Sequence, residues 1–242
     1  MDILSIAFEG VLGVLVAVVM VTTVGAIRNL KDGSQRLLQG HLFMAAVYLL
    51  LDRLFIYLVE SGVYALDDIV FHIYWHMIFY FFLLTFVVVG IGQNELEAYT
   101  KVQTKPFLMT GAVIHVVMLG ITAAIFIFGQ GANQVLVQAY GGSTIDAFGV
   151  HHFVALILAV LAVGVFFASS IGENRQARAR AYFLAMMVFF SLQQGWELVT
   201  ESWRLVRLDS EVIELVEKLV TVLPGFVLFL LGTRAVRKEG RE

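Results

Sequence analysis

The chain has 242 residues, of which 60% are apolar and 14% charged, and its formal net charge is -3. Soluble domains are nearer half apolar and a quarter charged, so the composition predicts an all-α, polytopic integral membrane protein. The small net charge argues against a nucleic-acid partner. The absence of cysteine excludes disulfides, iron–sulfur clusters, c-type haem attachment and cysteine-based zinc sites. The expected surroundings are the lipid bilayer of the cell's plasma (inner) membrane.

Apolar runs of membrane length predict seven transmembrane helices in a single domain that covers residues 1–242. In chain order the predicted spans are 5–27, 36–60, 67–92, 106–129, 145–171, 179–203 and 211–234. Pro106 is expected to open the fourth span, where a missing backbone N–H costs nothing. Pro224 lies inside the seventh span and is expected to kink it. Spans two to five are expected to form a central bundle.

Lysine and arginine residues collect on one side of this predicted topology. That side has twelve of them, namely Arg28, Lys31, Arg36, Lys101, Lys105, Arg175, Arg178, Arg180, Arg234, Arg237, Lys238 and Arg241. The other side has only Arg204 and Arg207. The positive-inside rule therefore predicts that the N-terminus lies outside and the C-terminus lies in the cytoplasm.

Six histidines fall on four consecutive spans, and ionisable groups at membrane depth are costly and usually functional. They are His41 in span two, His72 and His76 in span three, His115 in span four, and His151 and His152 in span five. His41 and His115 lie towards the cytoplasmic ends of their spans, whereas His76 and His152 lie towards the outer ends. The alternation predicts two pairs of facing imidazoles at two levels, an arrangement suited to two b-type haems in a helix bundle.

The series His41, His76, His115 and His152, with neighbours 35 to 39 residues apart, resembles the cytochrome b561 type of di-haem membrane protein. The resemblance covers spans two to five. It implies two b haems held by these four residues and electron transfer across the membrane. The chain would then be an electron carrier or the membrane-anchor subunit of an oxidoreductase, with a quinone or redox subunits as partners. Hydrogen-bonded packing residues are the plainer interpretation of the same histidines.

A non-haem metal site is a second interpretation of the third span. Asp68, His72 and His76 are spaced four residues apart, which places them on one stripe of a helix. Two imidazoles and a carboxylate are a ligand set for a single transition metal such as zinc, copper or iron. The candidate ligands are His72, His76, Asp68 and His151, with His152 or Glu197 able to complete the set. Because His76 lies deeper than His72, it is expected to be the inward ligand.

Charged residues near the outer ends of the spans form a third candidate site. They are Asp52, Arg53, Glu197, Glu214 and Lys218. A polar outer cavity of this kind is typical of a seven-helix transporter, channel or sensor that binds an ion, metal or ligand. Lys218 with Glu214 as its partner also permits a retinal-type lysine site. Internal ion pairs that orient the helices explain the same residues without a ligand.

Overall fold

The structure is a computed structural model that describes residues 3–30, 33–97, 101–141, 149–169, 177–206 and 209–239. The described chain is helical apart from its short connections, which confirms the predicted all-α class. Its helices are α1 (Ile3–Asn29), α2 (Gly33–Glu60), α3 (Asp68–Glu97), α4 (Lys101–Tyr140), α6 (Val150–Ser169), α7 (Ala177–Glu197), α8 (Ser210–Val216) and α9 (Leu223–Glu239). Two π-helical segments continue them, η1 (Leu198–Ser202) after α7 and η2 (Glu217–Val222) before α9.

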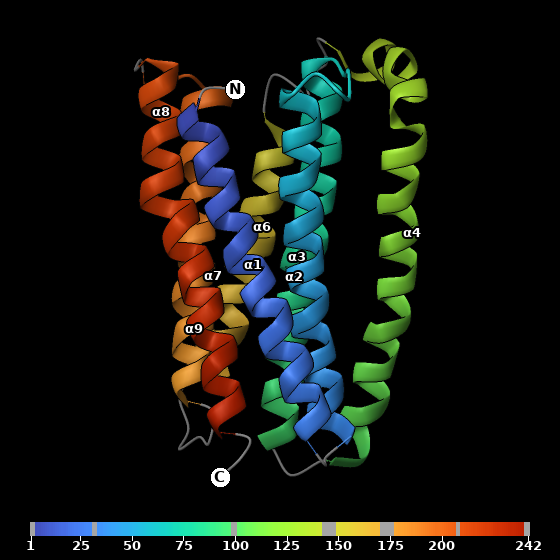
Figure 1. Cartoon of the computed structure of the whole chain (residues 1–242), viewed down its shortest axis with the longest axis vertical. Coiled ribbons are helices and arrows are strands. Elements are labelled where there is room, and N and C mark those ends of the chain that lie inside the picture. Colours follow the sequence, from blue (N-terminus) through green and yellow to red (C-terminus); the bar gives the residue numbers. More distant parts are fainter. Residues whose placement is uncertain are drawn as a thin grey trace.

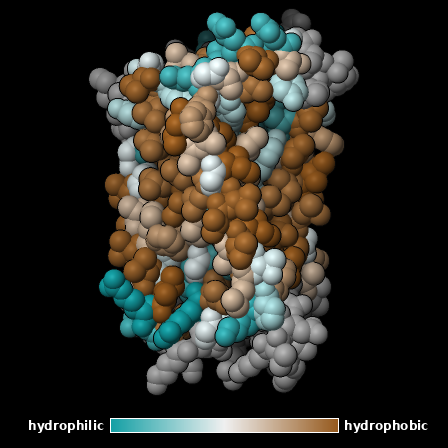
Figure 2. Space-filling model, turned by 90° about the vertical axis from the view of Figure 1, so that its right-hand side faces the viewer, coloured by the Kyte–Doolittle hydropathy of each residue, from teal (hydrophilic) through white to brown (hydrophobic). Residues whose placement is uncertain are grey.

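Six segments of the described chain are long and apolar enough to cross a membrane. They are Phe8–Asn29, Gly33–Glu60, Asp68–Gln93, Lys105–Tyr140, Val150–Ala168 and Val212–Val236. The remaining long helix, α7, is packed among them and buries Arg180, Gln193 and Glu197. Figure 2 shows apolar side chains over the middle of one face and polar side chains towards both ends. These features fit an integral membrane protein.

Six helices form a closed ring in the order α1, α2, α3, α6, α7 and α9, in which each packs against the next and α9 packs against α1. Phenylalanine side chains of α3, α7 and α9 pack inside this ring. The centroid of the Phe82 ring lies 5.3 Å from that of Phe190, and the Phe86 centroid lies 5.3 Å from that of Phe229. Such aromatic contacts add to the stabilisation from burial alone.

Helix α4 lies outside the ring, where it packs against α2 and α3 at the right edge of Figure 1. The expected central bundle of spans two to five is therefore wrong, because α6 packs between α3 and α7 instead of closing a bundle with α4. Much of the α4 surface remains apolar and exposed, including Val113, Val116 and Val117. A surface of this kind suits contact with lipid.

The structure also corrects the predicted ends of the fourth span. Helix α4 extends from Lys101 to Tyr140, so Pro106 lies inside it instead of opening it. At the other end the helix continues through a polar stretch expected to be a loop. The Tyr64 hydroxyl donates a hydrogen bond to the Ile125 carbonyl and accepts one from the Gln130 N–H. Asn133 Oδ1 accepts from the Asp67 N–H at 3.0 Å.

The region of Pro224 changes its hydrogen-bond pattern, since η2 ends two residues before it. The Leu223 N–H bonds to the Lys218 carbonyl, five residues back. The predicted start of span five, at residue 145, and the connection at 170–176 lie outside the described residues.

Candidate metal centre

The four histidines His41, His76, His115 and His152 meet in two pairs at opposite ends of the molecule. His76 of α3 and His152 of α6 lie near the end that holds the start of α1, with His76 Nε2 3.0 Å from His152 Nδ1. His41 of α2 and His115 of α4 lie towards the other end, with His41 Nδ1 2.8 Å from His115 Nε2. All four side chains are buried.

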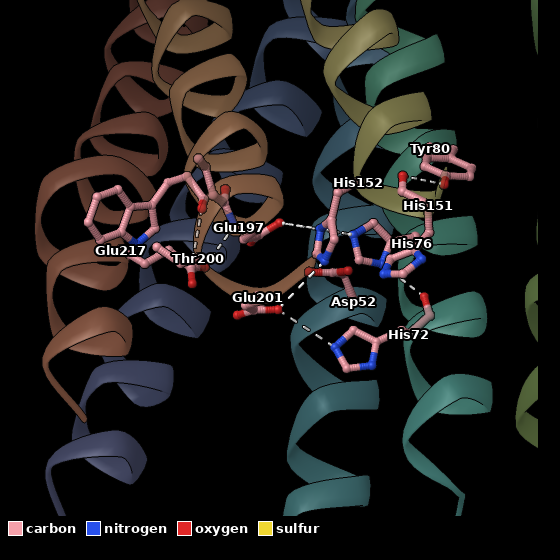
Figure 3. Close-up of polar contacts among 12 residues, drawn as sticks. Asp52, His72, His76, Tyr80, His151, His152, Glu197, Thr200, Glu201 and Glu217 are labelled. Carbon is pink, nitrogen blue, oxygen red and sulfur yellow. Dashed lines mark hydrogen bonds and ion pairs between the residues drawn. The ribbon is translucent and has the colours of Figure 1, made fainter. Parts of the chain in front are cut away.

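The first pair belongs to a larger cluster of ligand groups, shown in Figure 3. His151 joins His76 and His152, and one ring nitrogen from each of the three lies within 4.8 Å of the others. Glu197 of α7 brings a buried carboxylate, with Oε2 3.0 Å from His152 Nδ1 and 4.0 Å from His76 Nε2. Tyr80 donates to the His151 carbonyl at 2.6 Å and so ties α3 to the start of α6.

Backbone contacts assign the proton positions in this cluster. A carbonyl oxygen only accepts, so His76 Nδ1–H donates to the His72 carbonyl at 2.9 Å. The lone pair of His76 therefore lies on Nε2, which faces His152. Metal-binding histidines usually have this arrangement, in which the other ring N–H donates to a carbonyl or carboxylate.

The Gln193 amide supports Glu197 and also binds a second carboxylate, that of Glu217. Gln193 Nε2 donates to Glu197 Oε1 at 2.8 Å and to Glu217 Oε1 at 3.0 Å. Glu197 directly precedes η1, and Glu217 is the first residue of η2. π-Helical turns inside α-helices are frequent at functional sites, and here both lie at carboxylates of the same cluster.

His72 and Glu201 lie on the solvent side of the cluster. His72 Nδ1–H donates to the Asp68 carbonyl at 2.8 Å, which leaves its Nε2 facing Glu201 Oε2 at 3.9 Å. The same Glu201 oxygen lies 3.6 Å from His152 Nε2. The Asp68 side chain is 93% exposed, with Oδ1 3.4 Å from His72 Nδ1. Asp68 is therefore separated from the buried histidines, and His76, the deeper of its two neighbours, meets His152 as expected.

Asp52 and Arg53 form a buried ion pair next to the cluster. Arg53 Nη2 lies 2.6 Å from Asp52 Oδ2, and Arg53 Nη1 lies 3.6 Å from Glu9 Oε1 of α1. The Arg53 guanidinium also lies 6.0 Å from the centre of the Phe226 ring of α9. The Arg53 side chain of α2 therefore contacts α1 and α9, and its guanidinium is paired with two carboxylates.

Glu214 and Lys218 pair with each other, as expected from their spacing. The Glu214 side chain is 52% exposed, however, so the pair lies at the edge of the polar region and not within the buried cluster. The reason is that Glu214 belongs to the short helix α8 at the end of the molecule. Lys218 Nζ lies 5.7 Å from the centre of the Phe8 ring.

The second histidine pair is a closed chain of hydrogen bonds. His41 Nε2–H donates to the Leu108 carbonyl at 3.0 Å, so its Nδ1 accepts from His115 Nε2–H. The remaining nitrogen, His115 Nδ1, lies 3.1 Å from the Tyr48 hydroxyl. A Cβ at Gly111 would lie 2.8 Å from His41 Cε1, so glycine allows this close approach. Each ring nitrogen of the pair has a partner.

From the sequence, Gln193, Glu201 and Glu217 were expected among the polar residues near the outer ends of their spans, but their partners were not predicted, and Tyr48 had no predicted role. Glu201 follows Glu197 by four residues, and this spacing is a signal for a second carboxylate on the same side of the helix. The contact between Glu217 and Gln193 had no such signal, because the direction of the Glu217 side chain depends on the π-helical turn that begins there.

Comparison of the chain with protein-family models, with curated proteins and with solved structures finds no match. The site geometry therefore carries the functional argument by itself.

Proposed function

We propose that this protein is a membrane metalloprotein that binds one divalent first-row transition-metal ion through His76, His152 and Glu197. The observation that carries the proposal is the triangle formed by His76 Nε2, His152 Nδ1 and Glu197 Oε2, with sides of 3.0, 3.0 and 4.0 Å. A circle through these three atoms has a radius of about 2.0 Å, the length of bonds from zinc to imidazole nitrogen and carboxylate oxygen.

The number of hydrogen-bond acceptors relative to donors in the cluster also supports a bound cation. The lone pair of His76 Nε2 and the carboxylate of Glu197 both lie 3.0 Å from the same atom, His152 Nδ1. That nitrogen carries at most one hydrogen, so it cannot donate fully to both acceptors. A metal ion between the three atoms accepts electron pairs from all of them. His151 supplies a further imidazole, and imidazole with carboxylate suits zinc, iron, copper or nickel.

Metal analysis of the purified protein tests this proposal. Protein stripped with a chelator and reloaded with Zn²⁺ should retain about one ion per chain after desalting. His76→Ala and Glu197→Gln should lose it, since each removes a ligand. His41→Ala is the matched control, because it removes a buried histidine of the other pair and should keep the ion. Wild-type protein that retains no metal, or His76→Ala that retains as much as wild type, would overturn the proposal.

Bis-histidine haem binding is the second candidate, and the meeting of the four histidines in two pairs supports it. In that case the protein passes electrons through two b haems to a quinone or a redox subunit. Each pair must then separate, because axial ligands lie on opposite faces of the macrocycle. A reduced-minus-oxidised visible spectrum distinguishes the two functions. Sharp haem bands that fall by half in His41→Ala would favour haem, whereas bound zinc without such bands favours the metal centre.

A further inference from the structure

Two ligand pairs lie one above the other at the metal centre, displaced by one helical turn. On α3, His72 precedes His76 by four residues and is nearer the end of the helix. Opposite α3, Glu197 is the last residue of α7, and Glu201 lies four residues later, within η1. On α3, the four residues from His72 to His76 rise about 6 Å. An outer imidazole and carboxylate therefore repeat the inner imidazole and carboxylate at a shallower level.

Exposure separates the two levels. The inner side chains are buried, at 1% for His76 and 0% for Glu197. The outer side chains reach solvent, at 20% for His72 and 41% for Glu201. An ion arriving from water at this end of the molecule thus meets His72 and Glu201 before it meets the buried ligands.

His152 links the levels, because each of its ring nitrogens faces one of them (Figure 3). Its Nδ1 lies 3.0 Å from both His76 Nε2 and Glu197 Oε2. Its Nε2 lies 3.6 Å from Glu201 Oε2, which in turn lies 3.9 Å from His72 Nε2. The backbone bond from His72 Nδ1–H to the Asp68 carbonyl leaves His72 Nε2 with its lone pair towards this outer position.

We propose that His72, Glu201 and Nε2 of His152 form a loading site that captures a divalent transition-metal ion and delivers it to the buried centre. This inference rests on the proposed metal centre. The ion exchanges His72 and Glu201 for His76 and Glu197 and moves from Nε2 to Nδ1 of His152. As the ion moves inward, His152 releases the proton on Nδ1 to solvent, and Nε2 takes up a proton from solvent beside the exposed Glu201, so the ring keeps one proton. The ring proton is on Nδ1 while the ion is outside, and on Nε2, directed at Glu201, once the ion is inside. Exchange of this kind suits a metal ion that is a transported or sensed species.

The kinetics of cobalt binding test the loading site. Stripped protein in detergent is mixed with Co²⁺ in a stopped-flow instrument, and the visible absorption of the bound ion is followed. Glu201→Gln and His72→Gln should each slow loading, and slow release to a chelator, by about tenfold or more. Both should still bind one ion at equilibrium with little change in Kd. Asp68→Asn is the matched control, because it removes an exposed carboxylate beside His72 and should load at the wild-type rate.

Each contrary result has a distinct meaning. If wild type binds one ion and both variants load at its rate, the loading site is wrong and the buried centre stands. If Glu201→Gln or His72→Gln lowers the number of ions bound, or if wild type binds two, the outer residues are permanent ligands and the loading role is wrong. Wild-type protein that binds no Co²⁺ would overturn the metal centre, and the loading site with it.

Discussion

A buried imidazole has two ring nitrogens to satisfy, and the two histidine pairs of this protein differ in how they do so. At the His41–His115 pair every nitrogen has a partner of the right kind, ending at the Leu108 carbonyl and the Tyr48 hydroxyl. At the His76–His152 pair two acceptors share one nitrogen. The His41–His115 pair therefore needs no ligand to satisfy its nitrogens, whereas a bound cation would stabilise the His76–His152 pair.

Tyr48 should therefore be needed for stability. Tyr48→Phe leaves His115 Nδ1 buried without a partner, which typically costs about 1–3 kcal/mol. We expect a lower thermal melting temperature in detergent and an unchanged metal content. Tyr57→Phe is the control, since this side chain is exposed on the same helix and should melt like wild type. Equal melting of the two variants would mean that the Tyr48 hydroxyl contributes nothing to the pair.

Individual residues were predictable where depth in a helix decides their surroundings. His76 was expected to face inward because it lies one turn deeper than His72, and it is buried against His152. Glu214 and Lys218 were predictable as a pair, but not as an exposed one. The difference arises because spacing fixes which residues are neighbours on a helix, whereas burial depends on which helices pack around them.

At the scale of elements, both carboxylates that share Gln193 lie where an α-helix becomes a π-helix. A π-turn holds an extra residue and so rotates the helix before it relative to the helix after it. This lets Glu217 face Gln193 while α9 continues to pack its own side chains into the ring. The turn also precedes Pro224, whose missing N–H prevents a regular α-helical bond.

Removing one residue from η2 should disconnect Glu217. Deletion of Val220, an exposed residue of η2, should restore α-helical spacing and rotate the preceding helix by about 100°. Glu217 then leaves Gln193, and the support of Glu197 weakens. Loss of such outer support typically lowers metal affinity by about 10–100-fold. Competition with a zinc chelator measures this, and Val220→Ala is the control that should retain wild-type affinity.

The π-helical turns and the length of α4 could not be predicted from the sequence. The stretch at 129–140 contains four polar amides and two glycines, which favour a loop by local propensity. It is helical because contacts distant in sequence hold it, from Tyr64 to Gln130 and from Asp67 to Asn133. Tertiary contacts of this kind override propensity and leave no pattern within the helix itself.

At the scale of the whole molecule, hydropathy was enough to predict the long helices, since lipid admits only segments that satisfy their own backbone. It could not predict the ring. Which helices are neighbours depends on side-chain packing, and the phenylalanines of α3, α7 and α9 resemble lipid-facing residues in composition. The histidines and Glu197 were predictable as polar groups in the spans, but their division into buried side chains and side chains that reach solvent was not.

The orientation of the molecule is expected from its basic residues. Arg28, Arg36, Lys105 and Arg178 all lie near helix ends at the end of the molecule that holds the C-terminus (Figure 1). A reporter fused after Glu242 should therefore be active only in the cytoplasm. A reporter inserted at residues 61–65, between α2 and α3, should be active only outside. The opposite pattern would reverse the molecule and place the proposed metal centre at the cytoplasmic face.

The length of α4 has a consequence for the lipid around it. Exposed apolar side chains extend along it from Met109 to Val135, a rise of about 40 Å, whereas the hydrocarbon core of a typical bilayer is about 30 Å thick. A helix without restraints would tilt, so that its extra apolar length stays within the hydrocarbon core. Helix α4 is restrained towards both ends, by His41 at the Leu108 carbonyl and by Asp67 at Asn133, so we expect the bilayer beside it to thicken. We expect the reconstituted protein to melt at a higher temperature in long-chain lipids than in short-chain ones, and equal melting in both would show that α4 tilts freely.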